Sequence, residues 1–180
     1  MANEPQAAED PREAGAPRTT GPTRAYEGDR IRVLWDAGRC IHVGRCLRAL
    51  PAVFDVQARP WVDLEGAAAE EVAAAVRTCP TGALRYQGLG DLPDEAATEP
   101  VSVEVRPNGP LYVRGRVRVS RPGGDVVADE LRVALCRCGA SQNKPFCDNS
   151  HLEAGFQAAG ATPAEVLSDV APPTNKVIPT

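Results

Sequence analysis

Aromatic residues, methionine and long apolar runs are scarce in this chain. Aromatics make up 4% of its 180 residues and there is one Met, so no segment looks like a large apolar core. No stretch approaches the roughly 18 apolar residues of a membrane helix. The N-terminus has neither the basic start nor the apolar run of a secretory signal. The net charge of −4 argues against general nucleic-acid binding. We therefore expect a cytoplasmic protein with no membrane anchor and no nucleic-acid partner.

Catalytic motifs are also missing. No nucleophile–base arrangement, phosphate-binding loop or pair of catalytic carboxylates stands out, so we do not expect an enzyme. Pro (17) and Gly (16) are abundant, which favours short elements and many turns. Small domains bury too little surface to be secure alone, and a bound metal centre compensates for this. The composition therefore favours two small domains, each held by a metal centre.

The six cysteines and two histidines fall into two groups along the chain. In a reducing cytosol, clustered cysteines usually bind metal, whereas a disulfide framework would require an oxidising compartment. The close Cys-x-Cys spacing also strains a disulfide. The first group contains Cys40, His42, Cys46 and Cys79, and the second contains Cys136, Cys138, Cys147 and His151.

Residue patterns divide the chain into five segments. Residues 1–28 are acidic, rich in Pro and Ala and without periodicity, which predicts a disordered tail. Residues 29–87 combine strand and helix patterns, and residues 88–98 read as a polar linker. Alternating valines and leucines in 99–157 predict a small antiparallel sheet. Residues 158–180 carry four prolines and predict a loose tail.

Within the first domain, three apolar patterns define the expected elements. Arg30–Trp35 alternates as a strand does, and Ala83–Tyr86 reads as a closing strand. Between them, Ala67–Arg77 has one apolar face and two glutamates in its first turn, as expected of a helix. In the second domain, the last predicted strand runs straight into Cys136. The expected fold class is therefore α+β.

The second cysteine group has an unusual spacing. Zinc sites usually pair cysteines with two to four residues between them, whereas Cys136 and Cys138 have one. Here Cys136 and Cys138 are followed by eight residues before Cys147, which suits ligands spread over two iron atoms. Asp148 can cap a short helix over 149–155, and His151 then lies on the same helix face as Cys147.

This stretch resembles the CDGSH iron–sulfur domain, whose signature is C-x-C-x2-(S/T)-x3-P-x-C-D-G-(S/A/T)-H. The chain departs from the signature at Asn149, which replaces Gly; since Asn also tolerates a left-handed backbone, we expect the turn to survive. The resemblance covers roughly residues 99–157. The matching positions are Cys136, Cys138, Ser141, Pro145, Cys147, Asp148, Ser150 and His151.

The resemblance implies a [2Fe–2S] cluster held by three thiolates and one ring nitrogen of His151. Replacing a thiolate by a neutral imidazole leaves the cluster one unit less negative, so its potential should exceed that of an all-cysteine ferredoxin. The second ring nitrogen can titrate, so reduction should couple to protonation and acid should loosen the ligand. Membrane-anchored CDGSH relatives are dimers, which leaves a homodimer open here.

The first cysteine group approaches a ferredoxin pattern. Bacterial ferredoxins use C-x2-C-x2-C with a remote C-P, whereas this chain has Cys40, Val43 and Cys46, followed by Cys79–Pro80. Three cysteines can hold a [3Fe–4S] cluster, or a [4Fe–4S] cluster whose fourth iron has another ligand. His42 is long enough to be that ligand, and a loop histidine facing water is the alternative.

Roughly residues 28–87 resemble the divergent single-cluster 4Fe–4S ferredoxin-like family, which is often fused or adjacent to CDGSH domains. The resemblance is carried by four stretches: C-I-H-V-G-R-C (40–46), Val53–Phe54–Asp55, Arg59–Pro60–Trp61 and C-P-T-G-A-L (79–84).

Together these patterns predict a ferredoxin-like domain followed by a β-rich CDGSH domain. The leading functional expectation is electron transfer with redox partner proteins. One alternative is cluster storage or transfer to apo-acceptor proteins, or redox sensing by a labile cluster. The other alternative is a zinc-stabilised interaction module.

Overall fold

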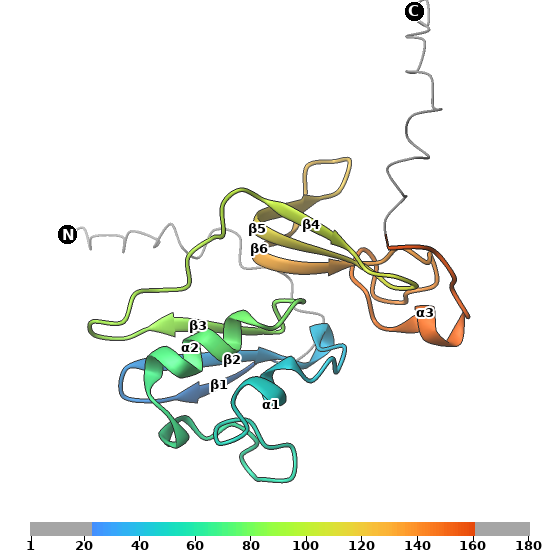
Figure 1. The fold of residues 1–180 in the computed structure, drawn as a ribbon. Coiled ribbons are helices and arrows are strands. Elements are labelled where there is room, and N and C mark those ends of the chain that lie inside the picture. Colours follow the sequence, from blue (N-terminus) through green and yellow to red (C-terminus); the bar gives the residue numbers. More distant parts are fainter. Residues whose placement is uncertain (1–22, 161–180) are drawn as a thin grey trace, which may run out of the picture.

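The computed structural model describes residues 23–160 and contains two three-stranded antiparallel sheets, one in each domain. Figure 1 shows α2 lying over the first sheet, and α3 beyond the end of the second sheet. The first sheet has the order β1-β2-β3 and the second the order β4-β5-β6. The elements are β1 Thr23–Glu27, β2 Ile31–Asp36, η1 Ala37–Arg39, α1 Arg45–Ala49, η2 Leu64–Gly66, α2 Ala69–Arg77, β3 Leu84–Gly88, β4 Ser102–Val105, β5 Leu111–Ser120, β6 Val126–Leu135 and α3 Ser150–Glu153.

The core of the first domain lies between α2 and its sheet. Val72 and Val76 of α2 are fully buried, together with Val33 of β2. The helix predicted over 67–77 begins two residues later, at Ala69. Ala68 at its N-cap has an extended backbone, and its side chain offers no capping acceptor. The helix ends at Arg77, which places Cys79 two residues beyond the helix, as the sequence predicts.

The second domain is organised around the long hairpin of β5 and β6. Its pairing register shifts between Arg114 and Val117. Gly115 lies in this bulge with φ +116°, and a Cβ there would meet the Thr98 carbonyl oxygen at 2.9 Å. Only glycine fits this position without strain. The hairpin then carries β6 to Leu135, directly before Cys136.

Three of the predicted segment boundaries differ from the structure. Strand β1 occupies residues that the prediction placed in the tail 1–28, because pairing with β2 orders them; residues 1–22 lie outside the described residues. The segment 88–98 is more than a linker, since Leu92 is buried in the first core. Of the tail 158–180, only 158–160 are described. There the backbone N–H of Asn108 donates to the Ala158 carbonyl oxygen and the backbone N–H of Ala158 donates to Asn108 Oδ1, both at 2.8 Å.

Buried ion pairs join the two domains. Glu130 of β6 accepts from Arg39 at 2.5 Å and from Arg85 at 3.0 Å, and the side chains of Glu130 and Arg39 are 3% and 4% exposed. Removing one member of a buried pair typically costs about 3–5 kcal/mol, because the remaining charge has no partner. The relative position of the domains is therefore strongly constrained by these charges.

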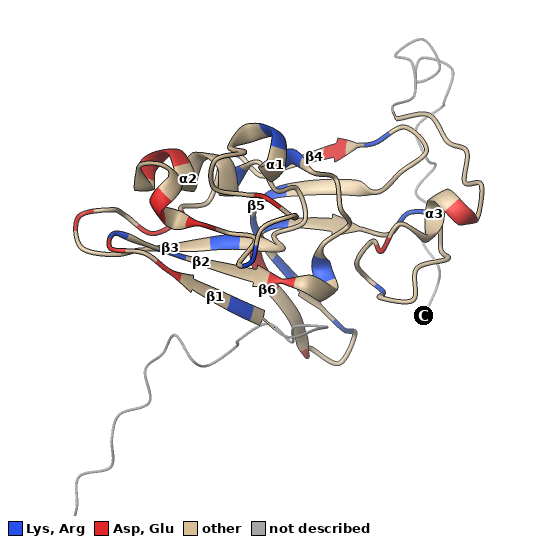
Figure 2. Cartoon of the chain, turned by 90° about the horizontal axis from the view of Figure 1, so that it is seen from below, with Lys and Arg blue, Asp and Glu red and all other residues tan. Residues whose placement is uncertain are grey.

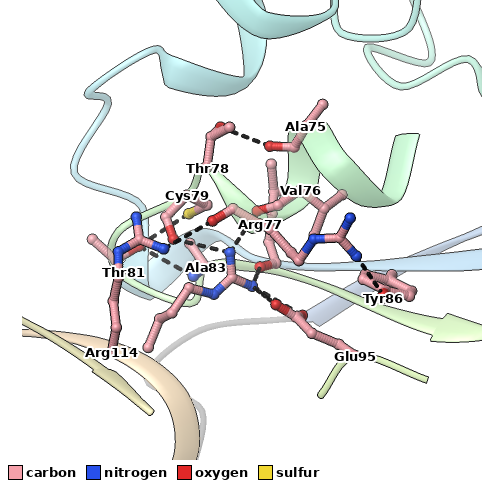
Figure 3. A network of polar contacts seen from close by, with 12 residues as sticks. Ala75, Val76, Arg77, Thr78, Cys79, Thr81, Ala83, Tyr86, Glu95 and Arg114 are labelled. Carbon is pink, nitrogen blue, oxygen red and sulfur yellow. Dashed lines mark hydrogen bonds and ion pairs between the residues drawn. The ribbon is translucent and has the colours of Figure 1, made fainter. Parts of the chain in front are cut away.

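A second set of arginines caps the C-terminal end of α2 from the other domain (Figure 3). Arg132 of β6 donates to the carbonyl oxygens of Val76 and Cys79, at 2.6 and 3.1 Å, and pairs with Glu95. Arg114 of β5 donates to the Arg77 carbonyl at 3.0 Å. Cations favour the negative end of a helix dipole. The segment that carries Cys79 is thus fixed by the second domain.

Within residues 23–160, no helix is long and apolar enough to cross a membrane.

Candidate metal centres

The second ligand group lies in the loop that follows β6. The backbone N–H of Cys136 donates to the Pro145 carbonyl at 2.9 Å, and that of Cys147 donates to the Ala134 carbonyl at 2.8 Å. These bonds fold the loop back onto the end of β6. Ser141 is buried, and its hydroxyl donates to the Phe146 carbonyl at 2.7 Å. The signature Ser and Pro therefore hold the loop in shape, while the cysteines and His151 supply the donors.

The four donors of this loop form two close pairs. The Sγ atoms of Cys136 and Cys138 are 3.7 Å apart, and Cys147 Sγ lies 3.6 Å from Nδ1 of His151. For tetrahedral coordination with metal–sulfur bonds of about 2.3 Å and metal–nitrogen bonds of about 2.0–2.1 Å, the donors on one metal are separated by about 3.5–3.8 Å. Each pair thus has the spacing of two ligands on one metal, and the donor set fits a cluster of two irons.

Backbone N–H groups point at the sulfur atoms of this site. Ala140 N donates to Cys138 Sγ and Asn149 N to Cys147 Sγ, both at 3.4 Å. Burial raises the pKa of the Cys147 thiol, and the Asn149 N–H opposes the rise. Burial also tends to raise the pKa of the Cys136 thiol. Backbone N–H donors, of which Ser141 has the largest effect, outweigh burial and bring this pKa below its ordinary value. These donors favour the thiolate form that binds metal.

Asp148 and Asn149 shape the turn that presents His151. Asn149 has φ +74° and precedes α3, so the turn survives the replacement of Gly as predicted. Asp148 accepts from the backbone N–H and the hydroxyl of Ser150, at 3.0 and 2.6 Å. Burial opposes ionisation, yet these bonds and one from the Gln142 N–H hold the pKa of Asp148 down at about 2. Asp148 therefore helps begin α3, although that helix is shorter than predicted.

The first ligand group is assembled from separate elements of the first domain. Cys40 follows η1, Cys46 lies in α1, and Cys79 follows α2. All three line one cavity, together with His42 and the indoles of Trp35 and Trp61. Nδ1 of His42 is 4.0 Å from Cys40 Sγ, and the His42 backbone has φ +53°. The structure therefore brings together the predicted ligands, although they are far apart in sequence.

The three thiols of this cavity affect one another electrostatically. Burial raises the pKa of Cys46 to about 11, and the neighbouring Cys79 adds to the rise. Burial likewise raises the pKa of Cys40, again with a contribution from Cys79. Three thiolates this close need a cation to be stable together, which a metal cluster supplies.

Two tryptophans point to a sulfur-rich occupant of the cavity. Among the described residues, Nε1 of Trp35 and Nε1 of Trp61 are buried and have no hydrogen-bond partner. A buried N–H without an acceptor is costly, typically by about 1–3 kcal/mol. The Trp35 N–H lies near Cys40 and counteracts the rise of the pKa of that thiol, although the contact does not meet the geometry of a hydrogen bond, so Trp61 is the clearer case of a missing acceptor. Cluster sulfides and thiolates would provide the missing acceptors, so the cavity fits an iron–sulfur cluster.

Two features of the ligand groups, the packing of Val43 and the buried indoles, do not follow from the residue patterns. Val43, at the position of the missing ferredoxin cysteine, packs against a buried group that joins Ile41 of its own loop to Tyr112, Ala134 and Cys147 of the second domain. The residue patterns indicate Trp35 as part of a strand and Trp61 as part of the family resemblance, but they do not indicate that both indole N–H groups are buried and unpartnered. Within residues 23–160, no three Cys, His, Asp or Glu side chains gather closely enough for a single metal ion. The donors of both groups are spread more widely than around one ion.

Comparison with known families assigns a class to each domain. A family model described as a divergent 4Fe-4S mono-cluster matches residues 26–88, and one described as an iron-binding zinc finger of CDGSH type matches residues 108–152. Both matched ranges contain their predicted ligand group in full. The chain belongs to the divergent 4Fe-4S mono-cluster family, and in this chain that domain is joined to a CDGSH-type domain.

Among curated proteins, the chain is similar to uncharacterized protein YjdI of Escherichia coli strain K12 and to that of Escherichia coli O157:H7. In both cases the identity is 33% over 67 residues, which cover 88% of YjdI and 37% of this chain. The family membership and the two ligand groups together identify an iron–sulfur cluster-binding protein with two sites, in a fold of the α+β class.

Proposed function

We propose that this chain is an electron-transfer protein, not an enzyme, that carries single electrons on two iron–sulfur clusters. The observation that carries the proposal is the contact between the two ligand loops. Ile41 and Val43 of the first loop pack in one buried group with Cys147 of the second. Two redox sites in contact suit a relay between two partners, whereas two sites that only stabilised separate domains would have no need to touch.

The C-terminal cluster is a [2Fe–2S] cluster in this proposal. Cys136 and Cys138 would hold one iron, and Cys147 and His151 the other, in agreement with the donor spacings of 3.7 and 3.6 Å. Such a cluster supplies a site that accepts one electron. With His151 in place of a thiolate, the protein stabilises the reduced form better than four cysteines would.

The N-terminal cluster is a [4Fe–4S] or [3Fe–4S] cluster held by Cys40, Cys46 and Cys79. The family description favours four irons. His42 is then the candidate for the fourth ligand, since its ring lines the same cavity as the three thiols. A [3Fe–4S] cluster would need only the three cysteines.

The electron would be exchanged with a partner protein that has an acidic surface. Next to the N-terminal site lies a hollow lined by Arg45, Arg48, Arg77 and Arg114. Figure 2 shows the basic residues of α1 on this part of the molecule, while the acidic residues of α2 lie at its first turn. Within residues 23–160, none of these four arginines forms an ion pair with a carboxylate. Complementary charge would steer an acidic redox partner to this hollow.

Anaerobic purification followed by metal and sulfide analysis tests the proposal. We expect a coloured protein with iron and inorganic sulfide, and two distinct EPR signals after reduction. Each signal should appear and disappear reversibly with the solution potential. A colourless protein that contains zinc and no sulfide would contradict the proposal and support the zinc-stabilised interaction module.

Cluster delivery is the second candidate function, and one observation favours it. Cys136, Cys138 and His151 are all partly exposed, so the C-terminal cluster would have an open side. An apo-ferredoxin incubated with the loaded protein distinguishes the two functions. Transfer of iron and sulfide to the acceptor supports delivery, whereas oxidation of the reduced protein without loss of iron supports electron transfer.

A further inference from the structure

Asn149, the residue that departs from the CDGSH signature, connects the two sites. Its Nδ2 donates to the backbone carbonyl of Ile41 at 2.7 Å. Ile41 directly follows Cys40, a ligand candidate of the N-terminal site. The backbone of Asn149 keeps φ +74°, a conformation that glycine adopts readily. Asparagine here therefore preserves the turn and adds a side chain that reaches the other ligand loop.

On its other side, Asn149 contacts the C-terminal site. Its backbone N–H donates to Cys147 Sγ at 3.4 Å. A continuous path therefore runs from Cys40 through the Ile41 peptide group and Asn149 to Cys147. It crosses two hydrogen bonds and otherwise follows covalent bonds. In the structure, this path ties a ligand candidate of one site to a ligand candidate of the other through a single side chain.

The path runs beside a buried apolar group, and its two hydrogen bonds are themselves part-buried. Ile41, Tyr112, Ala134 and Cys147 form one buried apolar group, with Val43 packed against it. Hydrogen bonds in such a low-dielectric environment are stronger than in water and lose less to solvent competition. The Ile41–Asn149 bond is therefore placed where it can fix the distance between the two loops.

We propose that Asn149 is a positioning residue that docks the N-terminal ligand loop onto the C-terminal one and completes the route by which an electron passes between the two sites. This inference rests on the proposed function. With one cluster held by Cys40, Cys46 and Cys79 and the other by the C-terminal ligand group, one electron would pass between the two sites along this route, and one cluster would be oxidised as the other is reduced. The electron passage makes and breaks no covalent bond, and the proton that reduction is expected to bring to the second ring nitrogen of His151 would come from solvent, since His151 is partly exposed.

Two further contacts join the segments that carry the ligand candidates. Nδ2 of Asn143 donates to the Gly38 carbonyl at 3.0 Å, and the Arg39 guanidinium stacks on the Phe146 ring at 4.7 Å. The Asn143 bond ends at Gly38, two residues before Cys40. Arg39 and Phe146 directly precede Cys40 and Cys147, but they meet through a ring face and not through a hydrogen bond. Asn143 thus offers a matched control: an amide-to-carbonyl bond of similar length across the same interface.

The decisive variant is Asn149→Gly in the fully loaded protein, because it restores the residue of the family signature and tolerates the same φ. Both clusters should load as in the wild type, with unchanged iron, sulfide and EPR spectra. After flash reduction by a photoexcited flavin, electron equilibration between the two sites should be several-fold slower. Amide hydrogens of residues 40–46 should also exchange faster. The Asn143→Ala variant should equilibrate at the wild-type rate.

Three other results would contradict the inference, and each would identify the step that fails. Wild-type equilibration in Asn149→Gly would reject the role of Asn149 and leave the electron-transfer proposal standing. Equal slowing in Asn143→Ala would show that general docking of the domains matters, and not this path. Absence of any electron passage between the sites of the wild type would reject the relay itself, together with the inference built on it.

Discussion

The two ligand groups are built in opposite ways. The C-terminal donors lie within sixteen residues, in one loop closed by its own backbone bonds, and three of the four are partly exposed. The N-terminal donors come from segments after η1, in α1 and after α2, and Cys79 is fixed by Arg132 of the other domain. A local site can be recognised from a short motif. A dispersed site depends on the whole fold, and here also on the neighbouring domain.

The largest expected effect is the selective loss of one cluster. Cys147→Ala should abolish the C-terminal signal and remove about two irons per chain, the content of one [2Fe–2S] cluster. Cys79→Ala should remove the N-terminal cluster. Iron analysis and EPR of both variants measure this. Because the C-terminal loop is closed locally, it should keep its cluster in Cys79→Ala. Loss of both clusters from either variant would contradict the distinction between a local and a dispersed site.

The next largest effect concerns the buried charges between the domains. Glu130→Gln should destabilise the protein by about 3–5 kcal/mol, because Arg39 and Arg85 lose their shared carboxylate partner. Asp129→Asn, on the same strand, is the control. Its partner Arg118 is largely exposed, so the loss should stay within about 1 kcal/mol.

Denaturant unfolding of the loaded variants, followed by far-UV circular dichroism and by cluster absorbance, compares the two substitutions. We expect Glu130→Gln to release the N-terminal cluster earlier than the C-terminal one, since the dispersed site relies on the interface. Similar losses of stability in both variants would show that the buried pair contributes no more than a surface pair.

The two candidate histidine ligands, His151 and His42, are expected to affect the potentials of different clusters. His151→Cys replaces a neutral ligand by a thiolate, so the potential of the C-terminal cluster should fall, on the order of 100 mV, with a changed EPR spectrum. His42→Ala in the same protein should leave that cluster unchanged and affect only the N-terminal one. Potentiometric titration followed by EPR measures both. An unaltered spectrum in His151→Cys would rule out His151 as a ligand.

The smallest expected effect comes from the indole N–H groups. Trp61→Phe and Trp35→Phe each remove one donor facing the N-terminal cavity. The reduced cluster is more negative and accepts these bonds more strongly, so each variant should lower the potential by an amount on the order of tens of mV, the equivalent of one hydrogen bond.

Tyr26→Phe is the control for the tryptophan variants. The Tyr26 ring packs edge-on against Trp61 at 6.3 Å and lines an adjoining pocket with Cys40 and Cys46, but it does not line the cavity that also contains Cys79. Redox titration of the N-terminal EPR signal compares the three variants. An identical shift in Tyr26→Phe would indicate altered packing and not a lost donor.

Most elements of the fold could be predicted from periodicity. The strand at Arg30–Trp35 and the helix ending at Arg77 are within two residues of β2 and α2. Strand β1 could not be predicted, because all its residues are at least partly exposed and carry no apolar alternation. It is ordered by pairing with β2, which is a tertiary interaction. The buried position of Leu92 in the supposed linker likewise depends on the core that it joins.

The sequence by itself determined which residues could be ligands and how the C-terminal ones are spaced, because a local motif fixes a local geometry. It also determined that Asn149 could take the place of glycine, since a left-handed turn tolerates both. The tertiary structure decided that Cys40, Cys46 and Cys79 meet in one cavity, because only packing of α2 against the sheet brings them together. It also decided that the two ligand loops touch through Ile41 and Asn149. No pattern within either segment encodes that contact, since it depends on the buried charges that hold the domains in register.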